Sequence, residues 1–358
     1  MIYLNNKVLR GKTSKIGALL VIKILGALFA TVVFAKFTPL VDSNLYLSGS
    51  YSADSSLRIL VVQTLAVMFN DLGGVFFTHV MFGVISCAGV LYYVATGGKR
   101  WAILLVLLFP SALIWTSIVS KEALFFGGFT LLLVVWSRFV TDSINRLDLF
   151  AAFLAFIFCA LLRPHYAVII VWLFFSVCIV KKYDARAWPI LIVALLLGAV
   201  AVYFFAWAEL LKAGYGNIDE AARASRFYTL GIEPRSAAGR VQFEQFIPLG
   251  VLTGIIGPLP EELVKRPEFI PFFIEGVFIL LFPLLMYQYA NMMNFSIKSS
   301  FFRFYWWCLI PGIITLMVLH SPFGILNPGS AIRWRTNFEP IFYMAPLLLF
   351  FQFKGRTR

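Results

Sequence analysis

The sequence has little charge for its length. Only 13% of its 358 residues are charged, 61% are hydrophobic, and the mean hydropathy is +0.87. Soluble globular domains have about 25% charged and about 45–50% apolar residues, so this composition excludes an ordinary soluble domain. The apolar residues form runs close to the roughly 20 residues that span the ~30 Å hydrocarbon core of a bilayer. A membrane protein is therefore expected.

Familiar catalytic motifs are also missing. The four cysteines lie inside apolar runs without a CxxC pair, which is typical of small core residues and predicts neither a disulfide nor a metal site. There is no Walker A motif, no GxSxG and no HExxH, so a nucleotide-driven pump, a serine hydrolase and a zinc protease have no support. We expect no metal ion and no cofactor.

The apolar runs predict an all-α protein, a polytopic transmembrane helix bundle with an irregular or helical loop region on one side. We expect a single integral-membrane domain over residues 1–358. The ten predicted spans are Ile16–Lys36, Val75–Thr96, Trp101–Val119, Ala123–Val140, Leu149–Leu162, Tyr166–Val180, Trp188–Ala208, Ile270–Asn291, Phe304–His320 and Phe338–Phe353. Ile59–Asn70 is predicted to be an interfacial amphipathic helix, and Phe246–Pro260 to be a re-entrant segment.

Basic residues are concentrated in the short loops on one side of these spans. With ten spans both termini lie on that side, which holds 16 basic and three acidic residues and so accounts for the net charge of +13. The positive-inside rule assigns this side to the cytoplasm. The opposite side has balanced charge and the long loops 37–58, 209–267 and 321–337. Because loops often carry function, we expect the working site there.

Two acidic residues are candidates for proton transfer. Asp42 follows the first span, where a partly desolvated carboxylate can take a proton from a hydroxyl group; a solvated loop residue or a helix cap is the alternative. Glu122 follows Lys121 at the start of the fourth predicted span. Ionisable residues at hydrocarbon depth are functional candidates, but an internal ion pair that fixes the helix register is an equally open interpretation.

Basic residues near the long loops are candidates for anion binding. Arg163 lies at the tip of a predicted hairpin, where its guanidinium can bind a phosphate or pyrophosphate, or can cap helix carbonyls. Arg235 and Arg240 belong to a loop that interleaves basic and aromatic residues. Arg333 and Arg335 flank a tryptophan before the last span, which is also typical of an aromatic belt with snorkelling cations.

Three stretches resemble the layout of the GT-C glycosyltransferase superfamily. They are the acid after the first span, the Pro-x-x-x-x-Trp-x-Ser-x-x-x-Lys-Glu stretch at 110–122 and the Arg-x-Arg-x-x-x-x-Pro stretch at 333–340. The size, the predicted spans and the Gly257-Pro-x-Pro260 loop look still more like bacterial O-antigen and capsule repeat-unit polymerases of the Wzy type. The paired RX10G signature of some members is absent, which leaves open which loop arginines matter.

The resemblance implies a polysaccharide polymerase that joins undecaprenyl-diphosphate-linked repeat units at the periplasmic face of the bacterial inner membrane. It implies that proton transfer or acceptor orientation falls to Asp42, Glu122 and His165. The residues implied for substrate binding are Arg163, Arg235, Arg240, Arg333, Arg335, Lys121 and His320. The implied partners are the lipid-linked glycan as donor and acceptor, membrane lipid and a chain-length regulator, with no nucleic acid.

Three alternatives stay open. A GT-C enzyme that moves one sugar from a polyprenyl phosphate would give a product one sugar longer instead of a ladder. A flippase or transporter of lipid-linked glycans would leave unpolymerised units on the cytoplasmic leaflet in its absence. A membrane acyltransferase using His165 or His320 lacks a supporting His-Asp motif.

Overall fold

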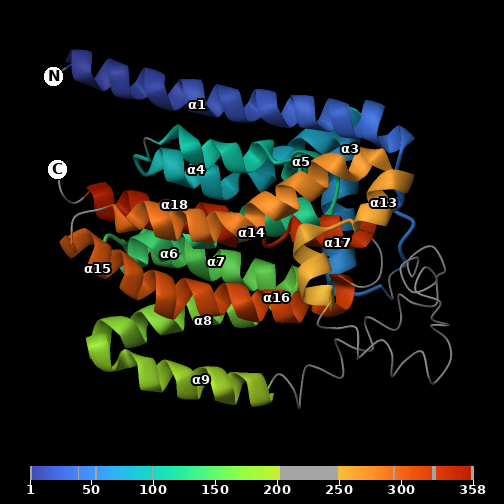
Figure 1. The fold of residues 1–358 in the computed structure, drawn as a ribbon. Helices are drawn as coiled ribbons and strands as arrows, with labels where there is room; N and C mark the ends of the chain where they lie inside the picture. The colour runs from blue at the N-terminus through green and yellow to red at the C-terminus, as the bar shows by residue number, and fades with distance from the viewer. Residues whose placement is uncertain are drawn as a thin grey trace, which may run out of the picture. The chain divides into compact units, whose positions relative to one another are not determined.

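The computed structural model describes residues 2–38, 40–52, 55–98, 100–201, 249–292, 295–324 and 328–355. These residues form helices and turns without a β-strand, so the predicted all-α fold is confirmed for the described part of the chain (Figure 1). The helices up to the middle of the chain are α1 (Ile2–Leu28), η1 (Phe29–Val33), η2 (Phe34–Lys36), α2 (Val41–Leu47), α3 (Leu57–Ser86), α4 (Ala88–Ala95), η3 (Trp101–Leu108), α5 (Pro110–Trp115), α6 (Lys121–Val140) and α7 (Arg146–Leu162). Those that follow are α8 (Pro164–Tyr183), η4 (Asp184–Arg186), α9 (Ala187–Ala201), α13 (Pro260–Lys265), η6 (Pro267–Phe269), α14 (Ile270–Asn291), α15 (Phe295–Phe304), η7 (Tyr305–Leu309), α16 (Ile310–Gly324), α17 (Pro328–Arg335) and α18 (Pro340–Gly355).

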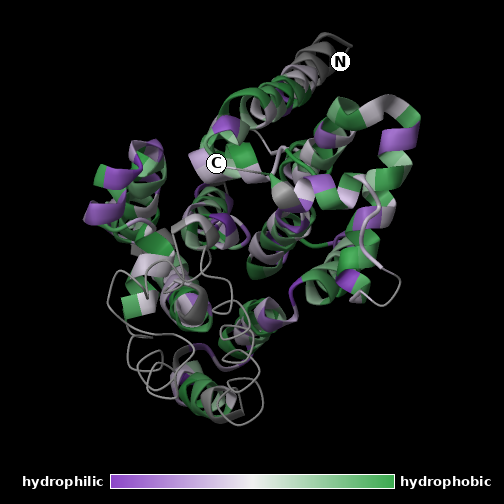
Figure 2. Ribbon diagram, turned by 90° about the vertical axis from the view of Figure 1, so that its right-hand side faces the viewer, coloured by the Kyte–Doolittle hydropathy of each residue, from purple (hydrophilic) through white to green (hydrophobic). Residues whose placement is uncertain are grey.

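Six helical segments of the described chain are long and apolar enough to cross a membrane. They are Thr13–Lys36, Leu57–Ser86, Lys121–Val140, Pro164–Tyr183, Pro267–Asn291 and Ser299–Ser321. Hydrophobic residues cover most turns of the helices (Figure 2). The chain thus has the helices of a multi-pass membrane protein, whereas the predicted count of ten spans is not confirmed.

Short or broken helices stand at three of the four predicted spans that are absent from these segments. The fourth, Trp188–Ala208, corresponds to α9 as far as Ala201, and the rest of it lies outside the described residues. The predicted spans Leu149–Leu162 and Phe338–Phe353 correspond to α7 and α18, which have 17 and 16 residues. The predicted span Trp101–Val119 is not one helix, because it consists of the 3-10 helix η3, the short helix α5 and a non-helical stretch at 116–120. Pro110 begins α5, since proline lacks an N–H group and fits the first turn of a helix.

The second predicted span also has different limits from those expected. The predicted interfacial helix Ile59–Asn70 and the following apolar run belong to one element, α3, which is interrupted at Gly74 by non-helical angles (φ 79°, ψ −179°). A residue with a Cβ atom rarely adopts this conformation, so glycine allows the kink between the two helical segments. The run is interrupted again at Cys87, and α4 follows.

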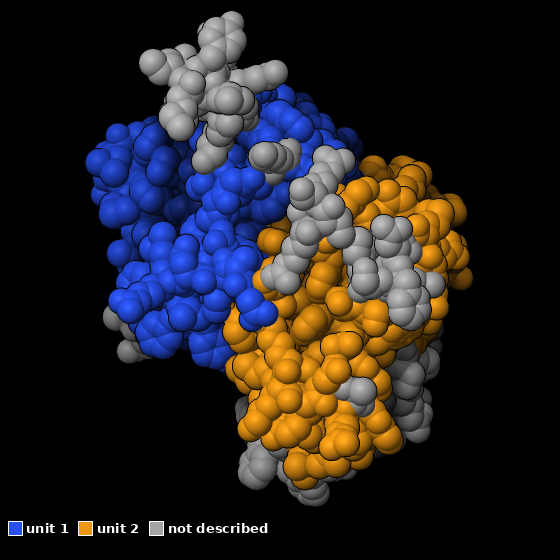
Figure 3. Space-filling model, turned by 90° about the vertical axis from the view of Figure 1, so that its left-hand side faces the viewer, with its two compact units in different colours: residues 1–138, 142–164, 336–340 blue, residues 139–141, 165–335, 341–358 orange. Residues whose placement is uncertain are grey.

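The described chain divides into two compact units, coloured separately in Figure 3. Unit 1 comprises residues 1–138, 142–164 and 336–340, and unit 2 comprises residues 139–141, 165–335 and 341–358. Each unit is described by itself below. The expectation of one integral-membrane domain stays a prediction.

In unit 1, glycines on α6 and α4 allow helices to approach closely. A Cβ atom on Gly127 of α6 would lie 2.3 Å from the carbonyl oxygen of Ile85 in α3. A Cβ atom on Gly128 would lie 2.8 Å from the sulfur of Cys159 in α7, and one on Gly89 of α4 would meet the backbone of Thr130. Small residues at such contacts are typical of helix packing in membranes, where close van der Waals contact replaces the hydrophobic effect.

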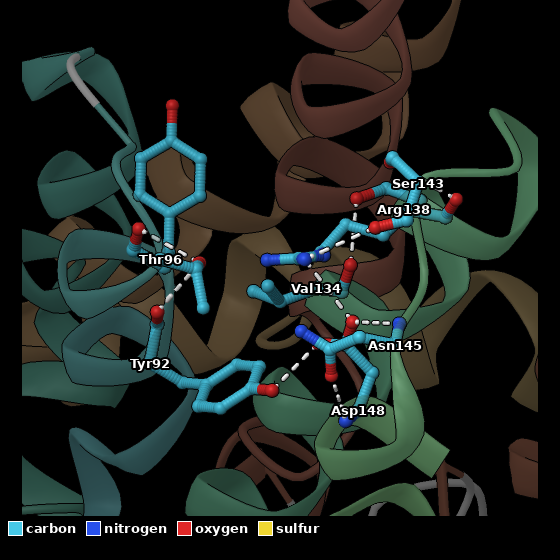
Figure 4. A network of polar contacts seen from close by, with 9 residues as sticks. Tyr92, Thr96, Val134, Arg138, Ser143, Asn145 and Asp148 are labelled. Atoms are coloured by element: carbon cyan, nitrogen blue, oxygen red, sulfur yellow. Dashed lines mark hydrogen bonds and ion pairs between the residues drawn. The ribbon is translucent and has the colours of Figure 1, made fainter.

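The loop end of the α6–α7 hairpin is closed by a polar network around Asp148 (Figure 4). The buried carboxylate lies 3.1 Å from the Arg138 guanidinium and accepts hydrogen bonds from the Tyr92 hydroxyl at 2.6 Å and the Asn145 amide at 2.7 Å. The Asn145 side chain accepts in turn from the Asp148 amide at 2.9 Å, which completes a capping box at the start of α7. This network joins α4, α6 and α7 at one end of unit 1.

In unit 2, polar side chains satisfy carbonyl groups where helices depart from regular geometry. The indole of Trp172 in α8 donates to the carbonyl oxygen of Cys308 at 2.9 Å, within the π-helix η7. The Tyr305 hydroxyl donates to the carbonyl oxygen of Pro283, a proline inside α14, at 2.5 Å. Proline and π-turns interrupt the regular hydrogen-bond ladder, so both of these hydrogen bonds lie where a helix is irregular.

We expect Gly127→Ala to destabilise unit 1 by about 1–3 kcal/mol, because the added methyl group meets a backbone carbonyl that no rotamer change can move. The measurement is thermal unfolding of the purified protein in detergent. Gly17→Ala is the matched control, since nothing lies within 4 Å of a Cβ at that helical position. Equal unfolding temperatures for the two variants contradict the packing described.

Candidate functional site

A buried ion pair joins the other end of the α6–α7 hairpin. Arg163, which follows the last residue of α7, lies 2.7 Å from the Glu122 carboxylate in the first turn of α6. The Glu122 side chain is fully buried and the Arg163 side chain is 11% exposed. Each charge also complements the dipole of its own helix, because an acid is favoured at a helix start and a base at a helix end. The structure therefore brings together two predicted site residues.

The stretch at 116–120, which we call the junction, leads into this ion pair. Its five residues are fully buried although they are not helical. Buried backbone groups need hydrogen-bond partners, and at membrane depth irregular backbone is tolerated only where protein or water covers it. The Val119 amide donates to Nδ1 of His79 at 3.0 Å, and the Ser43 hydroxyl donates to the Val119 carbonyl at 2.7 Å. Side chains from α3 and α2 thus hold the junction.

The junction also begins α6. The Ser120 hydroxyl donates to the Trp115 carbonyl at 2.7 Å and accepts from the Ala123 amide at 3.0 Å, as a serine at a helix start does. Lys121, half-buried, is the first residue of α6. The residues between Trp115 and the Lys121-Glu122 pair therefore form the turn that connects α5 to α6.

Asp42 lies beside the junction because the next residue, Ser43, is hydrogen-bonded to the junction. It lies half-buried in the first turn of α2, next to Ser43, whose hydroxyl is bonded to the junction. Glu122 lies three residues after the other partner in that bond, Val119. Two acids separated by 80 positions in the sequence are therefore held on elements that meet at one junction in unit 1.

Arg335 is fully buried in unit 2 and binds backbone carbonyls. Its Nη1 donates to the carbonyls of Ile255 at 2.6 Å and Ile256 at 3.3 Å, and its Nη2 donates to that of Phe272 at 3.0 Å. The Glu275 carboxylate lies 3.5 Å from Nη2. These contacts favour a structural role for this guanidinium. Substrate binding by Arg335 stays a prediction.

Two of the three carbonyls bound by Arg335, those of Ile255 and Ile256, end a helix at residues 249–256. Gly257 follows this helix with φ +93°, and its amide donates to the carbonyl of Thr253 at 3.0 Å, as in a left-handed helix cap. The Gly257-Pro258 pair singled out in the sequence therefore belongs to a helix end that Arg335 completes.

The other predicted residues of unit 2 have varied surroundings. His320 is fully buried with Nδ1 3.4 Å from the hydroxyl of Tyr166, whose ring lies 4.1 Å from the ring of the half-buried His165. Both predicted histidines are thus in contact with Tyr166. Arg333 is half-buried in α17. Arg235 and Arg240, with most of the loop 209–267, lie outside the described residues.

Several buried ionisable residues of the described chain were not among the predicted site residues. Lys23 in α1 is fully buried, Glu275 in α14 is 3% exposed, and His79 in α3 is 4% exposed. Lys23 and Glu275 interrupt predicted spans, and an ionisable residue inside an apolar run is itself a signal for a polar site. In the described part of the chain, no group of three or more His, Cys, Asp or Glu residues is arranged to hold a metal ion.

We expect Arg163→Ala to cost about 3–5 kcal/mol of stability, because it leaves the fully buried Glu122 carboxylate without its cation. Arg303→Ala is the matched control, since Arg303 pairs with Asp184 on an exposed surface and its loss should cost less than about 1 kcal/mol. Denaturation of both purified variants in detergent measures the difference. An Arg163→Met, Glu122→Gln double variant should recover most of the loss, and a double variant no more stable than Arg163→Ala would contradict the pairing.

Unit 1 holds Asp42, Glu122 and Arg163 around the junction. Unit 2 holds the buried Arg335 cap and the two histidines. No protein-family model, no curated protein and no solved structure matches this chain.

Proposed function

We propose that this chain is a glycosyltransferase of the bacterial inner membrane, acting as a polysaccharide polymerase on undecaprenyl-diphosphate-linked repeat units. The observation that supports this proposal is the junction, which holds a half-buried acid, Asp42, and an ion-paired guanidinium, Arg163, in the same unit. A carboxylate can take the proton of the acceptor hydroxyl, and a guanidinium can stabilise the charge on the leaving lipid diphosphate.

The proposed reaction joins the growing glycan to a hydroxyl group of a second lipid-linked unit. The hydroxyl oxygen attacks the anomeric carbon of the donor, the bond from that carbon to the diphosphate oxygen breaks, and the lipid diphosphate leaves with the electron pair. The carboxylate of Asp42 takes the proton of the hydroxyl group. Cationic groups stabilise the charge that develops on the diphosphate.

Glu122 and Arg163 have different roles in this proposal. The Glu122 carboxylate is fully buried in its ion pair, so we assign it the positioning of Arg163. Arg163 keeps 11% of its side-chain surface accessible, and a guanidinium can bind phosphate oxygens in a fixed planar geometry. Among the two predicted acids, Asp42 is therefore the better proton acceptor.

The placement of charge supports a periplasmic location for this chemistry. The α6–α7 hairpin has one ion pair at each end, Glu122–Arg163 and Arg138–Asp148. Arg138 lies sixteen positions after Glu122, which in a helix is a rise of about 24 Å, most of the ~30 Å thickness of the hydrocarbon core. The Arg138 end belongs to the face with the surplus of basic residues, which we assign to the cytoplasm together with both termini.

A second candidate function is transfer of a single sugar from a polyprenyl phosphate. It is favoured by the position of Asp42 on a short helix that directly follows the first membrane-spanning segment, as in the GT-C layout. The two reactions share the proton acceptor and differ in their product. A ladder of chain lengths indicates the polymerase, a product one sugar longer indicates the single transfer, and units retained on the cytoplasmic leaflet in its absence indicate a flippase.

We expect Asp42→Asn to lower transfer by about 10²- to 10⁴-fold, because the amide cannot take the proton of the acceptor hydroxyl. In cells, loss of the polysaccharide ladder on a gel measures this effect, with the amount of folded protein in the membrane measured in parallel. Asp71→Asn, at an exposed position of α3, is the matched control and should leave the ladder unchanged. A normal ladder in the Asp42→Asn variant would refute the role of this acid.

We expect Ser50→Cys, in the exposed turn after α2 and in a background in which the exposed Cys178 is replaced by serine, to react with a membrane-impermeant maleimide in intact spheroplasts. The reason is that this turn lies on the face opposite the surplus of basic residues. The control is a cysteine at Thr96, which is exposed at the end of α4 and should react only after lysis. The reverse pattern would overturn the periplasmic location.

A further inference from the structure

The junction is held at both ends by side chains of unit 1. At its start, the hydroxyl of Thr116 accepts a hydrogen bond from Nζ of Lys23 in α1. Near its end, the amide of Val119 donates to Nδ1 of His79 in α3 at 3.0 Å, and its carbonyl accepts from the hydroxyl of Ser43 in α2 at 2.7 Å. His79 is 4% exposed and Val119 is fully buried, so this contact lies inside the protein.

The hydrogen bond to Val119 fixes the protonation state of His79. A backbone amide can only donate, so Nδ1 accepts with its lone pair and carries no proton. The imidazole is therefore neutral, and its single N–H group is on Nε2. A charged ring or the other neutral tautomer would place two N–H groups against each other at this distance.

The helix that carries His79 is itself fixed against α6. The kink at Gly74 begins the second segment of α3, in which His79 lies. Six positions after His79, the carbonyl oxygen of Ile85 lies 2.3 Å from where a Cβ atom of Gly127 in α6 would be. One helical segment thus contacts the chain at Val119 and again eight positions later. Groups held on packed helices are positioned more exactly than groups on loops, so His79 is a rigid support for the junction.

Val119 connects the two groups that we propose to act in the reaction. Its carbonyl is bonded to Ser43, the residue next to Asp42. Three positions after it, Glu122 lies 2.7 Å from the guanidinium of Arg163. A displacement of this part of the junction therefore moves the proton acceptor and the anion-binding guanidinium relative to each other.

We infer that His79 is a positioning residue for the transfer reaction, which holds Asp42 and Arg163 at a fixed separation by binding the amide of Val119. The inference rests on the proposed function and names the residue that keeps its two groups aligned. His79 acts through the backbone of the junction and takes no part in the proton transfer itself. In enzymes, a displacement of about 1 Å in the reacting groups can cost about 10²-fold in rate.

Two variants of similar shape test this role. His79→Leu removes the acceptor and leaves the buried Val119 amide without one, whereas His79→Asn presents a side-chain oxygen close to the former position of Nδ1. We expect His79→Leu to lower the rate of polymer formation about 10²-fold and His79→Asn to recover most of this loss. The measurement is incorporation of labelled sugar into polymer in cells, divided by the amount of folded protein in the membrane. Equal rates in the two variants contradict the inference.

A third variant separates the two ring nitrogens. The longer side chain of His79→Gln places its polar group near the former position of Nε2, so this variant should be as slow as His79→Leu. Recovery by Gln in place of Asn shows that Nδ1 is not the atom that matters and refutes the positioning through Val119.

A spectroscopic measurement tests the hydrogen bond without reference to the reaction. The chain has three histidines, so the imidazole signals of ¹⁵N-histidine-labelled protein in detergent can be assigned by their loss in single variants. We expect the His79 ring to show an unprotonated Nδ1 and a protonated Nε2. A proton on Nδ1 excludes acceptance from the Val119 amide and sinks the inference.

Failure of this inference and failure of the proposed function give different results. If Asp42→Asn loses the polysaccharide ladder while His79→Leu keeps it at normal intensity, the proposed function stands and the positioning role is wrong. If both variants give a normal ladder, the proposed function is wrong, and the role of His79 in transfer is refuted with it.

Discussion

The cost of placing charge away from water is the constraint on which unit 1 depends. Helices α6 and α7 each carry a charged residue at both ends, and the ion pairs Glu122–Arg163 and Arg138–Asp148 join them. Removing one partner of such a pair leaves an uncompensated charge, so the pairs fix how the two helices are matched in length and direction. The apolar residues between them can then face lipid or neighbouring helices.

The same constraint explains the irregular backbone next to the site. The junction at 116–120 leaves helical geometry inside the protein, and both backbone polar groups of Val119 are bonded to side chains from other elements, His79 and Ser43. In a continuous helix the backbone N–H and C=O groups would bond to one another, so they would not be available to side chains of α2 and α3 at this point. The break in the helix is thus what holds Asp42 near the ion pair.

Unit 2 meets the constraint in a different way. The Arg335 guanidinium binds three carbonyls and lies beside Glu275, so one side chain completes a helix end and compensates a buried carboxylate. Arginine suits this position because its donors are spread over a rigid plane, whereas a lysine presents its three donors from a single nitrogen atom. An arginine in a sequence motif can therefore stabilise the fold as readily as it can bind a substrate.

The sequence by itself determined the class of the protein, because composition and apolar runs decide whether a chain can cross a membrane. It also located the acids Asp42 and Glu122 and the helix turn at Arg163. It could not predict that Trp101–Val119 is broken or that Lys23 is enclosed, because both depend on partners such as Thr116 and His79 that are distant in the chain. Only the tertiary structure decided which charges are paired. A hydropathy pattern indicates whether a residue prefers water or an apolar environment, but it does not indicate which other residue that side chain contacts.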